Sequence, residues 1–274
     1  MIKAYSWNIA HRPALWDDVA ALDADVALLQ EAPKPPEHIA ARAKTDAQPW
    51  RTEGGGTRCN WRAAVATLSS RVEARWHEPK PISDAVGGEF AVSRLGTLSA
   101  ATITAPEVEP LTFVSMYSRW ESPHATTNGS WIYADASAHR LISDLSVFIG
   151  RQSGHRIIAA GDLNILHGYG EGGSPYWGAR YQTVFDRFSA IGLRFVGPQA
   201  PWGRQADPWP RELPTDSMNV PTFYTAGHGV AGAARQLDFV FASADIANQV
   251  RVRALNGIDE WGASDHCRIE IEIG

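Results

Sequence analysis

The chain has 274 residues, a length that fits one large domain or two small ones. Its 44% hydrophobic and 20% charged residues are typical of a globular protein, and no apolar run approaches the ~18 residues of a membrane span. The net charge of −5 argues against a protein that coats nucleic acid through bulk positive charge. Two cysteines, Cys59 and Cys267, are too few for a disulfide framework, and no secretion signal is visible, so we expect a cytoplasmic protein.

Short apolar runs alternate with helical patterns along the chain. In chain order we expect a strand at 2–8, a helix at 14–22, strands at 26–30, 63–69, 96–104 and 111–117, a helix at 135–149, a strand at 156–160, a helix at 181–191 ended by Gly192, and strands at 236–242, 249–255 and 268–273. The helix at 135–149 has Leu141, Leu145 and Phe148 at helical spacing.

The predicted strands are of two kinds. The runs VALLQ at 26–30 and RIIAA at 156–160 are apolar throughout, so both faces of these strands should be covered. The run RIEIEI at 268–273 alternates, which indicates one wet face. We find no repeat and no linker, so we expect a single α/β domain over 1–274 with central sheets under outer helices. Two segments, 52–60 and 196–220, are expected to be long loops of the kind that often carry function.

Polar residues recur where the predicted strands begin or end. These residues are Asn8, Glu31, Tyr117, Asp162, Asn164, Asp238, Asp265 and His266. The ends of strands in layered α/β proteins converge on one rim, where ligands bind. We therefore expect these side chains to meet at one site.

Their chemistry suits phosphate esters. Hydrolysis of such an ester needs a cation to neutralise developing charge, a base for water, and donors for the phosphoryl oxygens. Glu31 and Asp265 offer the hard oxygen ligands that Mg²⁺ prefers, and Mg²⁺ keeps several waters, so few protein ligands are needed.

The remaining groups suit proton transfer and phosphate binding. Asp162 is placed to take the proton of water, and Asn164, two residues on, to donate to the phosphate. His266 can donate to a phosphate oxygen when it is charged, and a carboxylate such as Asp238 favours that charged form.

Each of these residues also has a purely structural interpretation. Asp and Asn favour turns after strands, a histidine is often a hydrogen-bonded core residue, and a tyrosine often fills a strand. Asp238 fits such an interpretation least well, because an unpaired carboxylate inside LDFVF would be costly to bury. His11, close to the first strand, is expected to be a solvated loop histidine.

The motifs SWNIA, LLQEA, AAGDLNI, QLDFVF and SDH occur in an order and spacing that resembles the endonuclease/exonuclease/phosphatase superfamily. The resemblance runs from residue 5 to about residue 267, and it is the combination of motifs that makes it specific. It implies a four-layer α/β sandwich, with two central mixed sheets flanked by helices and the site at one rim. Two departures, Gln236 before the LD pair and Cys267 after the final histidine, remove no catalytic group.

The resemblance also implies roles for the polar residues. On the metal side it places Asn8, Glu31 and Asp265. It implies that Asp162 orients the attacking water, that Asn164 binds metal or phosphate, that Asp238 orients the final histidine, and that Tyr117 and His266 contact the phosphate.

Three functions are compatible with these observations. The first is a Mg²⁺- or Mn²⁺-dependent phosphodiesterase with nucleic acid as substrate, that is, an endo- or exonuclease. The second is a small-molecule phosphatase or pyrophosphatase, which the acidic charge and the lack of a basic run favour. The third is a binding protein on an enzyme scaffold, which the complete set of catalytic residue types argues against. We expect no membrane association, and the sequence identifies no protein partner.

Five tryptophans lie in loop-like sequence, and they either stack on bases or pack beneath the loops. They are Trp120, Trp131, Trp177, Trp202 and Trp209.

Overall fold

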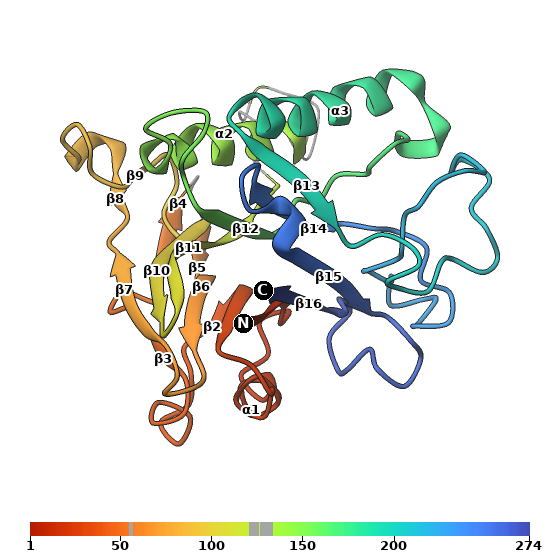
Figure 1. Cartoon of the computed structure of the whole chain (residues 1–274). Helices are drawn as coiled ribbons and strands as arrows, with labels where there is room; N and C mark the ends of the chain where they lie inside the picture. Colours follow the sequence, from red (N-terminus) through yellow and green to blue (C-terminus); the bar gives the residue numbers. More distant parts are fainter. Residues whose placement is uncertain (55–56, 121–125, 127–133) are drawn as a thin grey trace.

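Two six-stranded β-sheets pack face to face at the centre of the molecule, and helices cover their outer faces (Figure 1). The structure, a computed structural model, describes residues 1–54, 57–120, 126 and 134–274. The result is the four-layer α/β sandwich that the sequence predicts. Across the described ranges, no helix combines the length and the apolar character needed to cross a membrane.

The first sheet has the strand order β15-β16-β1-β2-β6-β3. Its strands are β1 (Ile2–Asn8), β2 (Val26–Pro33), β3 (Lys44–Thr45), β6 (Trp61–Thr67), β15 (Val250–Leu255) and β16 (Arg268–Ile273). In it, β1 is parallel to β2 and antiparallel to β16.

The second sheet has the strand order β13-β14-β12-β11-β10-β7. Its strands are β7 (Glu73–His77), β10 (Leu98–Ala105), β11 (Val108–Tyr117), β12 (Ile157–Asp162), β13 (Leu193–Gly197) and β14 (Asp238–Ser243). In it, β11 is parallel to β12, and β12 is antiparallel to β14.

Smaller elements complete the described chain. Two short pairs join β4 (Thr52–Gly54) to β5 (Thr57–Cys59) and β8 (Lys80–Pro81) to β9 (Ala91–Val92). The α-helices are α1 (Leu15–Ala20), α2 (Ala134–Leu145) and α3 (Pro175–Ala190). The 3-10 helices are η1 (Ile82–Asp84), η2 (Ser146–Phe148), η3 (Glu171–Gly173) and η4 (Ala247–Gln249).

The alternation of side chains along the central strands builds three hydrophobic layers. In β12, Ile158 and Ala160 pack between the two sheets, whereas Ile157 and Ala159 pack under α2 and α3. In β2, Leu28 enters the layer between the sheets, and its neighbours face α1 on the other side. Both faces of β2 and β12 are therefore covered, as their continuous apolar runs predict.

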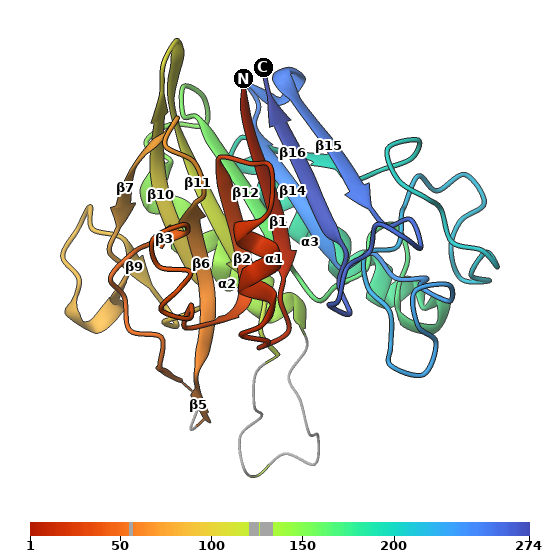
Figure 2. The same ribbon diagram turned by 90° about the horizontal axis from the view of Figure 1, so that it is seen from below.

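Strand direction decides where the polar strand ends meet. Parallel β1 and β2 end at the same rim, and so do parallel β11 and β12. Antiparallel β14 and β16 begin where their neighbours β12 and β1 end. Figure 2 shows the two chain termini side by side at the opposite edge, where β1 starts and β16 ends. Residues that follow β1, β2, β11 and β12 therefore share one rim with residues that open β14 and precede β16.

All the predicted strands and helices are present, with shifted ends. The prediction of a loop over 52–60 is wrong, because β4 and β5 form an antiparallel pair there. The sequence interpretation assigned a loop here because glycine is depleted in strands. The sequence interpretation also missed β7 and β13, and it began the third helix six residues late, at 181 instead of Pro175, which occupies the first turn.

Candidate active site

The GDLN segment ends β12 at the rim. A Cβ atom on Gly161 would lie 1.9 Å from the carbonyl oxygen of Met116 on β11, so this position requires glycine. The next residue, Asp162, stands in register with Tyr117 on β11 and with Asp238 on β14. Three of the predicted site residues therefore lie side by side across three neighbouring strands.

Asp162 is the buried centre of a hydrogen-bond network. Its Oδ2 atom accepts from Nδ2 of Asn8 at 3.1 Å and from Nδ2 of Asn164 at 3.2 Å, and its Oδ1 accepts from the backbone N–H of Asn164 at 2.9 Å. Asn8 belongs to the first sheet and Asp162 to the second, so the contact between them joins the two sheets at the rim. Burial raises the pKa of Asp162 to about 7, opposed by the charge of His266 and reinforced by Asp238 and Glu31.

His266 and Asp238 form a buried pair beside Asp162. Nδ1 of His266 lies 2.8 Å from Oδ2 of Asp238, and its Nε2 lies 3.8 Å from Oδ2 of Asp162. Burial opposes a charge on this histidine, but Asp238 and then Asp162 outweigh it and raise its pKa to about 10. His266 is therefore charged at neutral pH, with Nδ1 donating to Asp238 and Nε2 on the side of Asp162.

The SDH segment is fastened to the end of β1. Ser264 donates through Oγ to the carbonyl oxygen of Asn8 at 2.7 Å, and Nε1 of Trp7 donates to the carbonyl oxygen of His266 at 2.9 Å. Asp265 lies between Ser264 and His266 in the sequence and is half-buried. Its negative charge contributes to the raised pKa of His266. These contacts fix the histidine relative to the first sheet.

Glu31 reaches the rim through a β-bulge. The pairing of β2 with β6 shifts by one residue between Leu29 and Ala32, and Glu31 has a φ of 49°. Its Oε2 lies 2.6 Å from Nε2 of His11. Burial raises the pKa of Glu31, but His11 and then Tyr117 outweigh that effect and lower it. His11 lies in the turn after β1 and is exposed, as expected, but its ring also contacts Glu31, which the sequence did not predict.

Unusual backbone geometry gathers around these side chains. Of the five non-glycine residues described with positive φ, four lie at this rim: Ala10, His11, Glu31 and Asn164. Such residues cost roughly 1–3 kcal/mol each and persist where the surroundings fix them, often at functional sites. This clustering is a property of the backbone rather than of the side chains, and it supports a functional role for the rim.

The chain also brings residues to the rim that the sequence interpretation missed. Thr222 is fully buried, and its Oγ1 accepts from the backbone N–H groups of Leu237 at 3.0 Å and Asp238 at 3.1 Å. Phe223 packs its ring 4.9 Å from the ring of His266. Both lie in a segment without a sequence signal, so only tertiary structure reveals them.

The described tryptophans of the loop-like segments have different environments. Trp177 and Trp209 are partly buried against the hydrophobic core, whereas Trp120 and Trp202 are 40% and 63% exposed. Trp131 lies outside the described residues.

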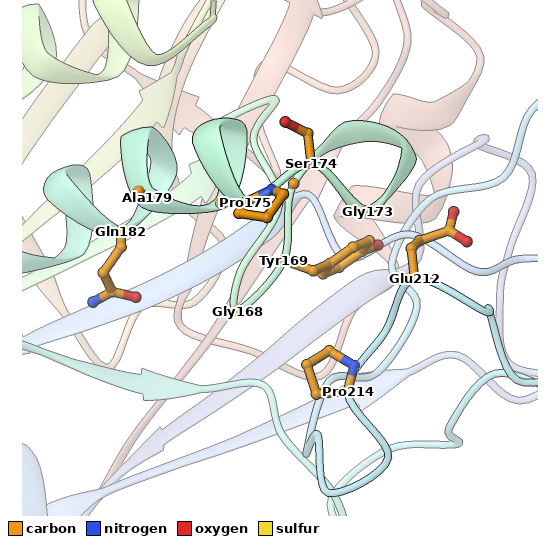
Figure 3. Close-up of a pocket in the computed structure, with 11 residues that line it drawn as sticks. Gly168, Tyr169, Gly173, Ser174, Pro175, Ala179, Gln182, Glu212 and Pro214 are labelled. Atoms are coloured by element: carbon orange, nitrogen blue, oxygen red, sulfur yellow. The ribbon is translucent and has the colours of Figure 1, made fainter.

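A separate pocket opens beside the start of α3. Figure 3 shows it, with the ring of Tyr169 and the side chain of Glu212 at its edge. None of the eight predicted site residues lines this pocket. The predicted site residues therefore lie outside this pocket.

The donor set at the rim fits a hydrated cation held by few protein ligands. Glu31 and Asp162 are carboxylates whose charges repel each other, and this repulsion contributes to the raised pKa of Asp162. A divalent cation relieves such repulsion, and Mg²⁺ accepts hard oxygen donors while keeping several waters. Within the described ranges, no group of three or more His, Cys, Asp or Glu side chains is arranged as a metal cage. The amide of Asn8 accepts from Ala10 N–H and donates to Asp162, so here it holds the carboxylate.

The fold is an α/β sandwich with two central six-stranded sheets, and its rim gathers carboxylate, amide and imidazole side chains around Asp162. The profile of the Endonuclease/Exonuclease/phosphatase family matches residues 5–266, and the chain belongs to this family. The resemblance seen in the motifs is thereby confirmed. No curated protein sequence matches the chain significantly.

Three solved structures of similar fold are endonucleases. The endonuclease domain of TRAS1, a telomere-specific non-LTR retrotransposon, is 17% identical with a TM-score of 0.62, over 100% of this chain and 98% of that one. The AP endonuclease LMAP from Leishmania major is 16% identical with a TM-score of 0.61, over 99% and 87%. An AP endonuclease from Archaeoglobus fulgidus is 15% identical with a TM-score of 0.60, over 100% and 99%. At these identities the likeness establishes a shared fold.

Proposed function

We propose that this protein is a divalent-metal-dependent phosphodiesterase that cleaves nucleic acid. The observation that carries the proposal is the buried network in which Asn8, Asn164 and the His266–Asp238 pair surround Asp162. Structures of the same fold are described as endonucleases, which favours a polynucleotide as substrate. The roles below rest on the contacts at the rim.

Asp162 orients the attacking water and accepts its proton. Two asparagine amides hold its carboxylate in place, so the orientation is fixed before substrate binds. Burial raises the pKa of the Asp162 carboxylate to about 7, which makes it a stronger base than an ordinary aspartate. Proton transfer from water to Asp162 is therefore well matched to neutral conditions.

His266 and Tyr117 hold the phosphoryl oxygens as negative charge grows. The charged His266 points Nε2 to the side of Asp162, while Asp238 holds Nδ1. Tyr117 is buried beside Glu31, and burial together with that carboxylate raises its pKa well above the usual value. Its hydroxyl is therefore kept protonated as a donor.

Glu31 and Asp265, with Asn8 beside them, would hold the Mg²⁺ or Mn²⁺ ion. When bound, such an ion neutralises charge on the phosphate and stabilises the leaving oxygen. In the described structure Glu31 contacts His11, and Asn8 contacts Asp162.

The test is cleavage of circular DNA, single-stranded DNA, RNA and small phosphate mono- and diesters with Mg²⁺ or Mn²⁺. We expect cleavage of polynucleotide that a chelator abolishes and that Asp162→Asn lowers by at least about a thousandfold, with the thermal unfolding midpoint retained. Asp186→Asn, an exposed change on α3, is the matched control. Near-wild-type rates for Asp162→Asn would remove Asp162 from the role of base.

A small-molecule phosphatase or pyrophosphatase is the second candidate. The net charge of −5 favours it, because a protein that follows a long polyanion usually carries a basic surface. Cleavage of small phosphate esters, with no cleavage of any polynucleotide, would favour this function instead.

A further inference from the structure

A cluster of aromatic and cationic side chains borders the site on the side of Glu31. The indole of Trp61 is at its centre, with the ring of His11 stacked on it at a centroid distance of 4.5 Å and an interplanar angle of 17°. The ring of Tyr117 meets Trp61 edge-on at 5.3 Å, and the guanidinium of Arg119 lies 5.2 Å from the Trp61 ring centroid. We call these four residues the Trp61 cluster.

The Trp61 cluster is continuous with the catalytic network. His11 contacts Glu31, and Tyr117 stands in register with Asp162. The backbone carbonyl of Ser118, between Tyr117 and Arg119, accepts from Nδ2 of Asn164 at 3.2 Å. A substrate held at Asp162 therefore extends over this cluster if it continues past Glu31 and Tyr117.

Arg119 is a half-buried cation without a carboxylate partner among the residues that the structure describes. Its Nη1 donates to Sγ of the buried Cys59 at 2.7 Å, and none of the ion pairs among the described residues involves Arg119. A thiol holds the guanidinium in place without neutralising it. An arginine fixed over an indole and left charged is suited to a phosphate oxygen.

His11 supplies the accessible part of the stack. Its side chain is 48% exposed, although its ring lies flat against Trp61 and its Nε2 is held by Glu31. A flat, partly exposed ring that cannot rotate freely is a surface on which another ring can stack. Aromatic stacking contributes affinity for any base, because every base has a π-face.

We propose that the Trp61 cluster binds one unpaired nucleotide next to the scissile phosphodiester, with Arg119 on its phosphate and the His11–Trp61 stack against its base. This inference rests on the proposed nuclease function and names the form of its substrate. A single-stranded or locally unpaired strand fits better than a continuous duplex, because bases inside a duplex offer their faces only to each other.

The experiment measures binding and cleavage separately on the full-length protein. A labelled single-stranded oligonucleotide, the same strand in duplex, and the same strand with one base replaced by an abasic spacer serve as probes. The variants are Arg119→Gln and Trp61→Leu, with Trp61→Phe as the conservative replacement. Arg75→Gln, which removes an exposed charge from β7 at the far edge of the second sheet, is the matched control.

We expect Arg119→Gln and Trp61→Leu each to raise the Kd and KM for the single strand about tenfold, while Trp61→Phe recovers most of the loss. Arg119→Gln should also reduce the slope of log Kd against log salt concentration by about one, the value expected for one lost phosphate contact. Removing one base should weaken binding to the wild type about tenfold and binding to Trp61→Leu much less. The thermal unfolding midpoint of Arg119→Gln should match that of Arg75→Gln.

The possible outcomes separate the two ideas. If the wild type cleaves strands but Arg119→Gln and Trp61→Leu behave like Arg75→Gln, the subsite is overturned and the nuclease function stands. If single strands bind through Arg119 and Trp61 without being cleaved, the subsite stands and the proposed function fails. Tighter binding of the duplex than of the single strand also overturns the subsite.

Discussion

The hydroxyl of Thr222 is the contact that fixes the start of β14. It accepts hydrogen bonds from the backbone N–H groups of Leu237 and Asp238 in a fully buried position. Thr222→Val keeps the shape and leaves both donors without a partner, so we expect a loss of about 2–4 kcal/mol in the free energy of unfolding. Urea denaturation measures this loss.

The same substitution should also lower kcat about tenfold, because Asp238 holds His266. Thr225→Val, at an exposed position nearby, is the control and should change neither quantity. Equal stability of the two variants would show that water or a shifted backbone satisfies these donors.

The glycine of the GDLN segment is required by packing. A Cβ atom on Gly161 would meet a backbone oxygen at 1.9 Å, whereas one on Gly87 would meet nothing within 4 Å. Gly161→Ala should therefore cost at least about 3 kcal/mol in the free energy of unfolding, or prevent folding, while Gly87→Ala should be nearly neutral. Soluble yield and thermal unfolding distinguish these results, and two equally stable variants would show that β11 and β12 can separate without cost.

At the scale of elements, β1 and β16 are joined by a charged cluster on their outer face. Glu270 accepts from the hydroxyl of Tyr5 at 2.6 Å and lies 2.9 Å from Nζ of Lys3. Burial raises the pKa of Glu270, but Tyr5 and Lys3 outweigh it, so the pKa in the folded state is lowered. The ionised form is therefore the one that the folded state stabilises.

We expect Glu270→Gln to lower the free energy of unfolding by about 1–2 kcal/mol at pH 7. A carboxyl with a lowered pKa stabilises the fold above its ordinary pKa of 4.5, and this contribution disappears as the pH falls through the folded value. The difference between variant and wild type should thus shrink below a pH of about 4. Urea denaturation at pH 7 and at pH 3 measures it, with Glu73→Gln on β7 as control, and a difference that grows in acid would contradict the assignment.

The elements that were predicted and those that were missed differ in a physical way. The strands β2 and β12 could be predicted from the sequence. Both of their faces are buried, so they are continuous apolar runs. The strand β7 lies at the edge of its sheet, so its sequence EARWH carries few apolar residues. The bulge that turns Glu31 to the rim depends on pairing with β6, which no local pattern encodes.

At the scale of the whole molecule, both sheets contribute residues to the same rim. The rim could be predicted because strand direction brings the polar ends of β1, β2, β11 and β12 together with the starts of β14 and β16. The supporting residues could not, because His11, Trp61, Arg119 and Thr222 act through contacts between segments far apart in sequence. Such contacts exist only after the sheets have packed.

This convergence of acidic groups predicts that a cation stabilises the fold. A Mg²⁺ ion that relieves the repulsion between Asp162 and Glu31 would bind the folded protein in preference to the unfolded chain. By mass action, a ligand at a hundred times its Kd adds about 2.7 kcal/mol, which corresponds to several degrees in the unfolding midpoint of a chain of this size. We therefore expect Mg²⁺ to raise the midpoint of the wild type and a chelator to reverse the rise.

The variant that tests the position of the ion is Glu31→Gln, which should lose most of the midpoint shift. Glu171→Gln, whose carboxylate pairs with Arg235 at 3.0 Å, removes the same charge from an exposed position and should keep the shift. Calorimetry with Mg²⁺ and with Ca²⁺ reads the effect without any turnover, so a failed activity assay cannot obscure it. Equal shifts in the two variants would mean that the cation binds away from Glu31, and the metal-side assignment of this residue would then have to be withdrawn.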